Sequence, residues 1–148
     1  MNQFQEDLKT GKGYEGYILS RIQLNYPTSH MMEGKDSRYD IWIPEIEEGV
    51  EVKYDGMSAK TGNIVIEIEF GGVPSALSVT EAAWWTVITP TRVGWFLPER
   101  IRDCIKENNL VVREFVGRGD TKSKKAYLIK EQLLFNYAER TDKNERTH

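Results

Sequence analysis

The sequence predicts an α/β fold in which a mixed central β-sheet is flanked by helices. Apolar residues recur at helical spacing from Gly13 to about Gln23, and a helix is also expected from Pro98. Residues 63–70, NIVIEIEF, instead alternate in the manner of a β-strand. Along the chain the predicted elements run helix, three strands, helix, strands, and this order favours an α/β domain.

Length and composition favour one domain. The 148 residues are 39% hydrophobic and 29% charged, which suits a single core over residues 1–148, with a C-terminal tail that frays from about residue 141. The apolar runs are short and interrupted by charges, and the N-terminus is polar. We therefore expect no membrane span, no signal peptide and an intracellular, cytoplasmic location.

Two functional classes are disfavoured by residue counts. The single Cys104, with only His30 and His148 as other soft ligands, cannot form a zinc site or an intrachain disulfide, so we expect a packed thiol in a helix. The net charge of −3 gives no general attraction to nucleic acid. Any DNA contact must come from a local basic cluster.

The first half of the chain is predicted to place acidic residues on regular elements. The helix from Gly13 to Gln23 buries Tyr14, Ile18 and Ile22, and it carries Glu15 close to that apolar face. Residues 39–43 form a strand that ends at Pro44, and residues 50–54 form its partner across an acidic turn. With residues 63–70 as a third strand, the prediction is a three-stranded meander.

Further elements are expected after residue 76. Ser78 and Glu81 have the spacing of a capping box, which predicts a short helix through Trp84. Strands are predicted for WTVIT and RVGWFL around a Thr-Pro-Thr turn, and a helix from Pro98 to about Asn109. Two later strands, VVREFV and KAYLIK, flank a glycine-containing basic loop, and EQLLFNYAER is expected to be a closing helix.

The stretch YDIWIPEIEEGVEVKYD carries the candidate chemistry. Glu51 and Lys53 share one face of the second strand, and Val52 points to the other. If the two strands pair so that Asp40 lies near Glu51, two carboxylates and an ammonium group form one cluster. Mg²⁺ prefers carboxylate oxygens and leaves its other positions to water and phosphate. The alternative is a solvated hairpin, as we expect for Glu45, Glu47 and Glu48 of the turn.

This hairpin and its surroundings resemble the core of the PD-(D/E)XK nuclease superfamily. That pattern is a helix with a Glu, a strand with Asp, a strand with Glu-x-Lys, a third strand and a helix, and Glu15, Asp40, Glu51 and Lys53 match it one by one. Tyr39 stands where a Pro is usual. The resemblance implies a restriction-endonuclease-like αβββαβ core.

A second stretch, GNIVIEIEFGGVPSALSVTEAAWW, is similar to one in small, largely phage-type nucleases of the same superfamily, which include Holliday-junction resolvases. Their pattern is N-x-x-x-E, G-x-P-S-G and T-x-A-x-x-W. The matching residues here are Asn63, Glu67, Gly72, Pro74, Ser75, Thr80, Ala82 and Trp84 or Trp85. Ala76 departs from the usual Gly. The match implies an intracellular enzyme that a virus could encode.

The resemblance implies a metal-dependent DNA endonuclease. Asp40, Glu51 and the Val52 carbonyl would bind Mg²⁺, with Mn²⁺ as a substitute, and Lys53 would orient or help deprotonate the attacking water. Glu15 would complete the metal shell, and Glu67 would lie near it. Glu67 has a second interpretation as a solvated strand carboxylate.

Several residues are candidates for contact with DNA. Ser75 could donate to a phosphate or simply close its turn, and Thr80 could place a hydroxyl near the site with Trp84 one helical turn away, although core packing is favoured for Trp84. The basic cluster could follow a phosphate backbone or be a solvated hairpin tip; it contains Arg118, Lys122, Lys124 and Lys125.

Three alternatives remain open at this point. One is a structure-specific junction resolvase of the same superfamily, which would act as a homodimer to cut two strands. Another is a catalytically silent nucleic-acid-binding module, and the third is a small interaction domain whose acidic hairpin is only surface. Stabilisation by divalent cations would separate the third from the others.

Overall fold

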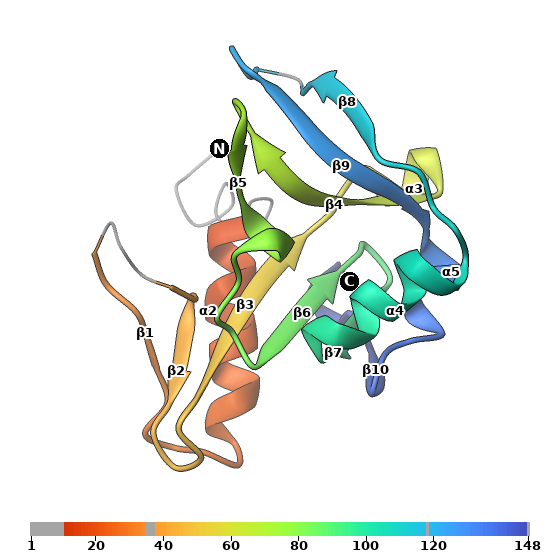
Figure 1. The fold of residues 1–148 in the computed structure, drawn as a ribbon. Helices are drawn as coiled ribbons and strands as arrows, with labels where there is room; N and C mark the ends of the chain where they lie inside the picture. Colours follow the sequence, from red (N-terminus) through yellow and green to blue (C-terminus); the bar gives the residue numbers. More distant parts are fainter. Residues whose placement is uncertain (1–10, 35–37, 118, 148) are drawn as a thin grey trace.

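Two β-sheets organise the protein. The computed structural model describes residues 11–34, 38–117 and 119–147, and these form a mixed six-stranded sheet and an antiparallel four-stranded sheet (Figure 1). The helices are few and short. The predicted α/β class with a mixed sheet is therefore confirmed.

The six-stranded sheet, which we call the main sheet, has the order β1-β2-β3-β6-β7-β10. Neighbouring strands are antiparallel except β3 and β6, which are parallel. A parallel pair needs a long crossover, and here residues 55–83 supply it. The strands are β1 (His30–Met31), β2 (Ile41–Ile43), β3 (Glu48–Tyr54), β6 (Trp84–Ile88), β7 (Arg92–Phe96) and β10 (Arg140–Lys143).

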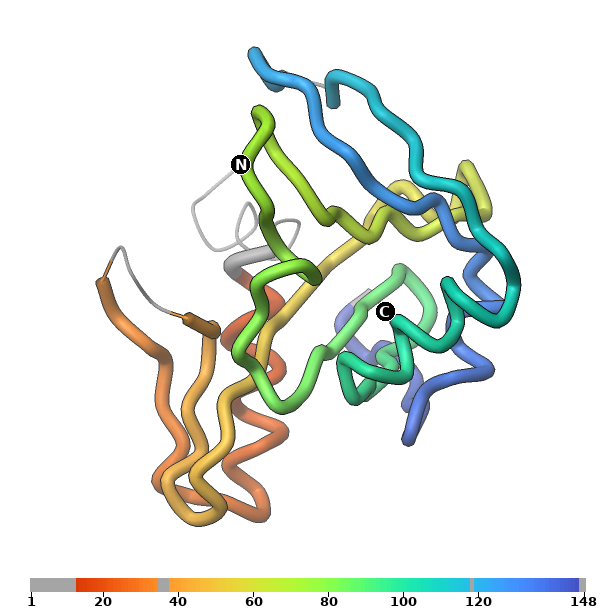
Figure 2. The backbone as a smooth tube through the Cα atoms, viewed as in Figure 1, coloured from red at the N-terminus to blue at the C-terminus, as the bar shows by residue number. Residues whose placement is uncertain are grey.

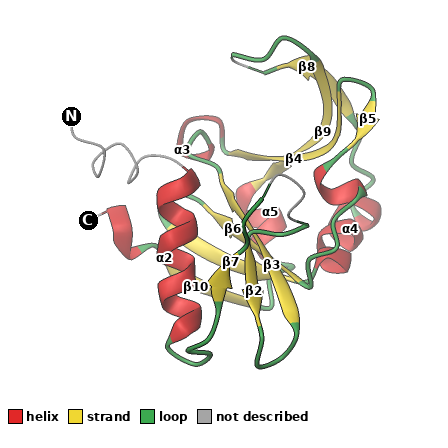
Figure 3. Cartoon of the chain, turned by 90° about the vertical axis from the view of Figure 1, so that its left-hand side faces the viewer, coloured by secondary structure: helices red, strands yellow, loops and turns green. Residues whose placement is uncertain are grey.

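Helix α2 (Gly11–Gln23) covers one face of the main sheet (Figure 3). Its buried side chains Tyr14, Ile18 and Ile22 form a cluster with sheet residues that include Val50 and Val52. The observed helix confirms the predicted spacing, because positions 14, 18 and 22 lie one above another on an α-helix.

The four-stranded sheet, which we call the second sheet, lies on the other side of the main sheet. Its order is β5-β4-β9-β8, and a second apolar cluster joins it to the main sheet through Ile64, Ile66, Trp85 and Val87. Helix α4 (Pro98–Glu107) contributes Ile101 to this cluster. The strands are β4 (Asn63–Phe70), β5 (Val73–Pro74), β8 (Arg113–Val116) and β9 (Ser123–Lys130).

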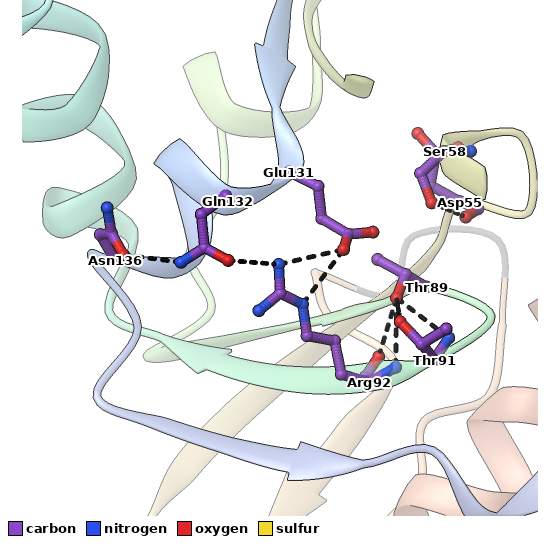
Figure 4. Close-up of polar contacts among 8 residues, drawn as sticks. All are labelled: Asp55, Ser58, Thr89, Thr91, Arg92, Glu131, Gln132 and Asn136. Atoms are coloured by element: carbon purple, nitrogen blue, oxygen red, sulfur yellow. Dashed lines mark hydrogen bonds and ion pairs between the residues drawn. The ribbon is translucent and has the colours of Figure 1, made fainter. Parts of the chain in front are cut away.

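Polar contacts connect the two sheets (Figure 4). After β3, the Asp55 carboxylate accepts hydrogen bonds from the backbone N–H groups of Met57 and Ser58, at the start of α3 (Ser58–Thr61), and from that of Val65 in β4. Arg92 of β7 forms a 3.0 Å ion pair with Glu131 at the start of α5 (Glu131–Phe135), which follows β9. Both contacts lie at the same end of the second sheet, where β4 begins and β9 ends.

The predicted meander is wrong. Residues 63–70 form a strand with the expected alternation, but β4 pairs with β9 and β5 and does not continue the main sheet. Figure 2 shows the chain leaving β3, passing through the second sheet and returning at β6. Strand pairing depends on distant partners, which a local alternation pattern does not identify.

The helix predicted through Trp84 is also wrong. A single 3-10 turn, η1 (Ala76–Ser78), precedes an irregular segment, and Trp84 already begins β6. The aromatic and β-branched run WWTVI fits a strand, and this preference prevails over the local capping-box pattern. The helix predicted from Pro98 is confirmed as α4, where Cys104 is fully buried and burial raises the pKa of its thiol to about 11.

The C-terminal part differs from the expected closing helix and frayed tail. Helix α5 ends at Phe135, and residues 140–143 form β10, which pairs with β7. Beyond it, Asn144 is fully buried and donates hydrogen bonds to the Tyr14 hydroxyl and the Thr89 carbonyl. A short turn, η2 (Glu145–Thr147), follows. None of the described helices has the length and apolar character to cross a membrane.

Candidate functional site

The β2–β3 hairpin places Asp40 beside Glu51. Ile41 pairs with Val50, and the Asp40 backbone N–H donates to the Val50 carbonyl at 2.9 Å, so the ladder continues to the next pair. The Asp40 side chain is fixed by a 2.7 Å hydrogen bond from the Val52 N–H to Oδ2. The pairing that the sequence required for a carboxylate cluster is therefore present.

Glu51 and Lys53 point to the face of β3 that is turned toward the second sheet. The Lys53 Nζ lies 3.4 Å from Glu51 Oε1 and 5.5 Å from the centre of the Trp85 ring. Exposed fractions are 21% for the Glu51 side chain and 42% for that of Lys53. Val52, on the opposite face, is buried under α2. The predicted division of the strand into a charged and an apolar face is confirmed.

The surroundings of the Glu51 carboxyl group disfavour its ionised form. Burial, and next the charge of Asp40, raise its pKa from 4.5 to about 7, against the opposing effect of Lys53. One ammonium group is thus insufficient to offset desolvation and a neighbouring carboxylate. The pair has the chemistry to accept a further cation.

Two adjoining cavities meet at this site. One, of about 370 Å³, is lined by Glu51 and by the exposed ion pair Arg38–Glu81, whose atoms are 3.2 Å apart. The other, of about 350 Å³, extends toward Asp55 and Met57. Lys53, Glu67, Ala76 and Trp85 line both. The candidate site is therefore part of a groove between the two sheets, which we call the inter-sheet groove.

Glu67 brings the second sheet into this groove. Its Oε2 accepts a 2.7 Å hydrogen bond from the Ser75 hydroxyl, and its Oε1 lies 3.8 Å from the Nζ of Lys124 on β9. The Lys124 ammonium is also 3.2 Å from Asp120. The Glu67 carboxylate is thus fixed in the cavity wall by Ser75 and Lys124. Ser75 makes this contact in addition to closing the turn that contains it.

Thr80 lies beside a tryptophan at the site, but this tryptophan is Trp85 and not the predicted Trp84. The Trp85 indole N–H donates to Thr80 Oγ1 at 2.9 Å, and both residues line the cavity that contains Glu51. Trp84 points to the α2 face, where its indole N–H donates to Glu48 at 3.4 Å. Glu48 is thus half-buried, and Glu45 and Glu47 are exposed as predicted.

Glu15 comes from the other side of the main sheet. It is half-buried on α2, which packs on the Val50 and Val52 face, whereas Glu51 and Lys53 occupy the opposite face. Its participation in a metal shell stays a prediction. The same holds for the Val52 carbonyl.

The predicted basic cluster is divided by the structure. Arg118 lies outside the described residues. Lys122 is exposed, while Lys124 and Lys125 belong to strand β9 and not to the loop. Lys125 is 3.5 Å from Glu69. Of the described members, only Lys124 lines the inter-sheet groove.

The donor set at the site is a carboxylate pair. Among residues 11–34, 38–117 and 119–147, no three His, Cys, Asp or Glu side chains come together as a metal-binding group. Mg²⁺ commonly binds through one or two carboxylates and keeps several waters, so Asp40 and Glu51 fit such an ion by ligand type.

Sequence reasoning missed Arg38, Ala76 and Glu81 as residues of the cavity. Their convergence depends on the crossover between β3 and β6, for which the sequence carries no local signal. For Trp85 a signal existed, since the T-x-A-x-x-W pattern allowed either tryptophan. Comparisons of the chain with protein-family models, curated proteins and solved structures found no match.

Proposed function

We propose that this protein is a metal-dependent DNA endonuclease that hydrolyses phosphodiester bonds in the inter-sheet groove. The observation that carries the proposal is the position of Asp40 beside Glu51 on the β2–β3 hairpin, where Glu51 and its ion-pair partner Lys53 line a cavity. The raised pKa of Glu51 adds to it, because functional sites concentrate such shifts.

The order of elements gives further support. Helix α2 is followed by β1, β2 and β3 as antiparallel neighbours, and then by β6 parallel to β3. These elements support only part of the αβββαβ core that the resemblance implies. Its expected third strand, Asn63–Phe70, is β4 of the second sheet, and the crossover carries only the four-residue α3 and the turn η1 in place of a longer helix.

The residues divide the chemistry as follows. Asp40 and Glu51 would hold a divalent cation, which when bound supplies an activated water and stabilises charge on the phosphate oxygens. Asp40 is already oriented by the Val52 N–H. Lys53, beside Glu51, donates a hydrogen bond to a phosphate oxygen or to the attacking water and neutralises developing charge.

The test is cleavage of labelled linear, branched and supercoiled DNA with Mg²⁺, Mn²⁺, Ca²⁺ or chelator. Mg²⁺ and Mn²⁺ are expected to support cleavage, whereas Ca²⁺ binds without turnover. Asp40→Asn, Glu51→Gln and Lys53→Met should each reduce the rate by about 100-fold or more. Glu47→Gln, in the exposed turn of the same hairpin, is the matched control and should cut normally.

Two results would overturn the proposal. One is undiminished cleavage by both Asp40→Asn and Lys53→Met, and the other is full activity in chelator. Thermal denaturation with each cation gives a second readout, since a ligand that binds only the folded state raises its stability. Stabilisation by Ca²⁺ that Asp40→Asn abolishes would support the assigned ligands independently of turnover.

A further inference from the structure

We propose that the strand cut by this protein is unpaired, and that it runs along the inter-sheet groove with Lys53 and Lys124 contacting phosphates on opposite walls. This inference rests on the proposed function and specifies its substrate class. It depends on the shape of the groove, its rim and the placement of its charges.

The groove passes the candidate site on both sides. One cavity runs from Glu51 to the Arg38–Glu81 ion pair, and the other runs from Lys53 toward Met57. A passage that continues past Lys53 in two directions suits a polymer with the scissile bond in its middle.

The dimensions favour one strand. Each cavity has a volume of about 350–370 Å³, near the lower end of the roughly 300–1,000 Å³ that pockets for single drug-sized ligands occupy. That is room for about one nucleotide on each side of Lys53. In duplex DNA the major groove alone is about 12 Å wide, and both strands arrive together. Cavities of this volume therefore suit the nucleotides of one strand better than both strands of a duplex.

The walls come from different sheets. Lys53 and Trp85 belong to the main sheet, while Glu67 and Lys124 belong to the second sheet, which the Asp55 and Arg92 contacts hold in place (Figure 4). At one end the Arg38–Glu81 ion pair connects the segment before β2 to the segment before β6. A strand that follows the groove therefore lies between side chains of both sheets.

Apolar side chains lie exposed at both ends of the groove. Val79 lines the cavity at the Glu51 end, while Met57 and Val65 line the other. Each is exposed despite its apolar character. Paired bases keep their faces inside the duplex stack, whereas unpaired bases can turn these faces to a protein surface. The exposed apolar residues therefore match an unpaired strand.

Lys124 supplies a second phosphate contact. Its ammonium is half-buried in the groove wall and is held by Glu67 and Asp120. A phosphate can replace these carboxylates as the partner of the ammonium group. Each phosphate contact on a single strand contributes a slope of about −0.7 to the dependence of log K on log salt concentration. Loss of Lys124 should reduce the slope by about that amount.

The experiment compares one labelled sequence as a single strand, as a blunt duplex and as a duplex with an unpaired arm. Cleavage is measured in Mn²⁺ and binding by anisotropy in Ca²⁺. We expect cuts confined to unpaired segments, with at least tenfold preference over duplex in both rate and binding. Lys124→Gln should weaken single-strand binding and lower its salt slope.

Variants of exposed residues test the path of the strand. Met57→Glu and Val79→Glu place a negative charge at either end of the groove and should each reduce single-strand binding at least tenfold. Val116→Glu is the matched control, because Val116 is also an exposed valine, on β8, and does not line the two cavities. Its binding should stay at the wild-type level.

The outcomes separate this inference from the proposed function. Equal cleavage of duplex and single strand, or normal binding by both Met57→Glu and Val79→Glu, overturns the inference and leaves the nuclease proposal intact. Preferential binding of single strands without cleavage in any metal overturns the nuclease proposal and supports the inferred path. Absence of both cleavage and single-strand binding overturns both.

Discussion

The two faces of strand β3 are built from alternate residues of one short segment, yet they differ in burial and in charge. On one face Val50 and Val52 are buried against α2. On the other, Glu51 and Lys53 remain partly exposed in a cavity that the second sheet borders. Apolar side chains cover one face, whereas on the other face the charged groups are partly removed from water, which disfavours their ionised forms.

This difference teaches how the fold divides stability from chemistry. The α2 face gains free energy from burial of apolar area. The Glu51 face carries a carboxyl group whose raised pKa opposes folding at neutral pH. We therefore expect substitutions on the α2 face to change stability strongly, and substitutions on the Glu51 face to change activity with little loss of stability.

The largest stability effect is expected on the α2 face. Ile18 is fully buried between α2 and the main sheet, so Ile18→Ala should lower the free energy of unfolding by about 2–5 kcal/mol. Urea denaturation measures this. Leu24→Ala, at an exposed position after the same helix, should stay within about 0.5 kcal/mol. A loss below 1 kcal/mol for Ile18→Ala would contradict the comparison.

The contribution of Glu51 to the stability of the protein should fall as the pH rises. Because the pKa of Glu51 is about 7 in the folded protein and near 4.5 when unfolded, the folded state binds the extra proton between these values. Stability contributed by this group is present at low pH and is lost as pH rises from about 4.5 to 7, by at most about 3 kcal/mol.

The comparison that isolates this effect is wild type against Glu51→Gln. The variant cannot ionise, so the free-energy difference between the two proteins should grow in favour of the variant as pH rises to 7 and then level off. Denaturation at pH 5, 6, 7 and 8 measures it. A constant difference across these values would show that the Glu51 pKa is not raised.

The Glu51 face was predictable from sequence to the extent that it depends on local rules. Period-two alternation separated Glu51 and Lys53 from Val52, and a short turn limited the hairpin register enough to bring Asp40 alongside. The wall opposite was not predictable in this way. Glu67 reaches the groove because β4 pairs with β9, about 60 residues later in the chain.

The C-terminal strand was missed for a related reason. The segment Arg140–Lys143 has no apolar alternation, and its pairing with β7 at the sheet edge involves backbone groups that any sequence offers. At residues 78–84 two local preferences conflicted, and the strand preference of the tryptophan-rich run prevailed. Predictability thus ended where distant partners decide the structure.

The missed C-terminal segment provides a prediction of intermediate size. Asn144 connects helix α2 to the segment after β6, because its amide donates hydrogen bonds to the Tyr14 hydroxyl at 3.1 Å and the Thr89 carbonyl at 2.8 Å. Asn144→Ala leaves these groups without that donor and should cost about 1–3 kcal/mol. Asn25→Ala, at an exposed position, serves as the control in the same denaturation series. Equal stability of the two variants would show that the hydrogen bonds of Asn144 do not stabilise the fold.

The smallest expected effect returns to the groove. Ala76 lines both cavities and has a φ of 46°, in the left-handed region that favours glycine. A non-glycine residue there costs about 1–2 kcal/mol, while glycine adds roughly 0.5–1 kcal/mol of chain entropy to the unfolded state. Ala76→Gly should therefore stabilise the protein by about 1 kcal/mol or less. Ala59→Gly, in helix α3, relieves no such strain and should destabilise it by a similar amount. If both substitutions destabilised the protein equally, the inter-sheet groove would carry no backbone strain at Ala76, and its cost to folding would come from its charged groups alone.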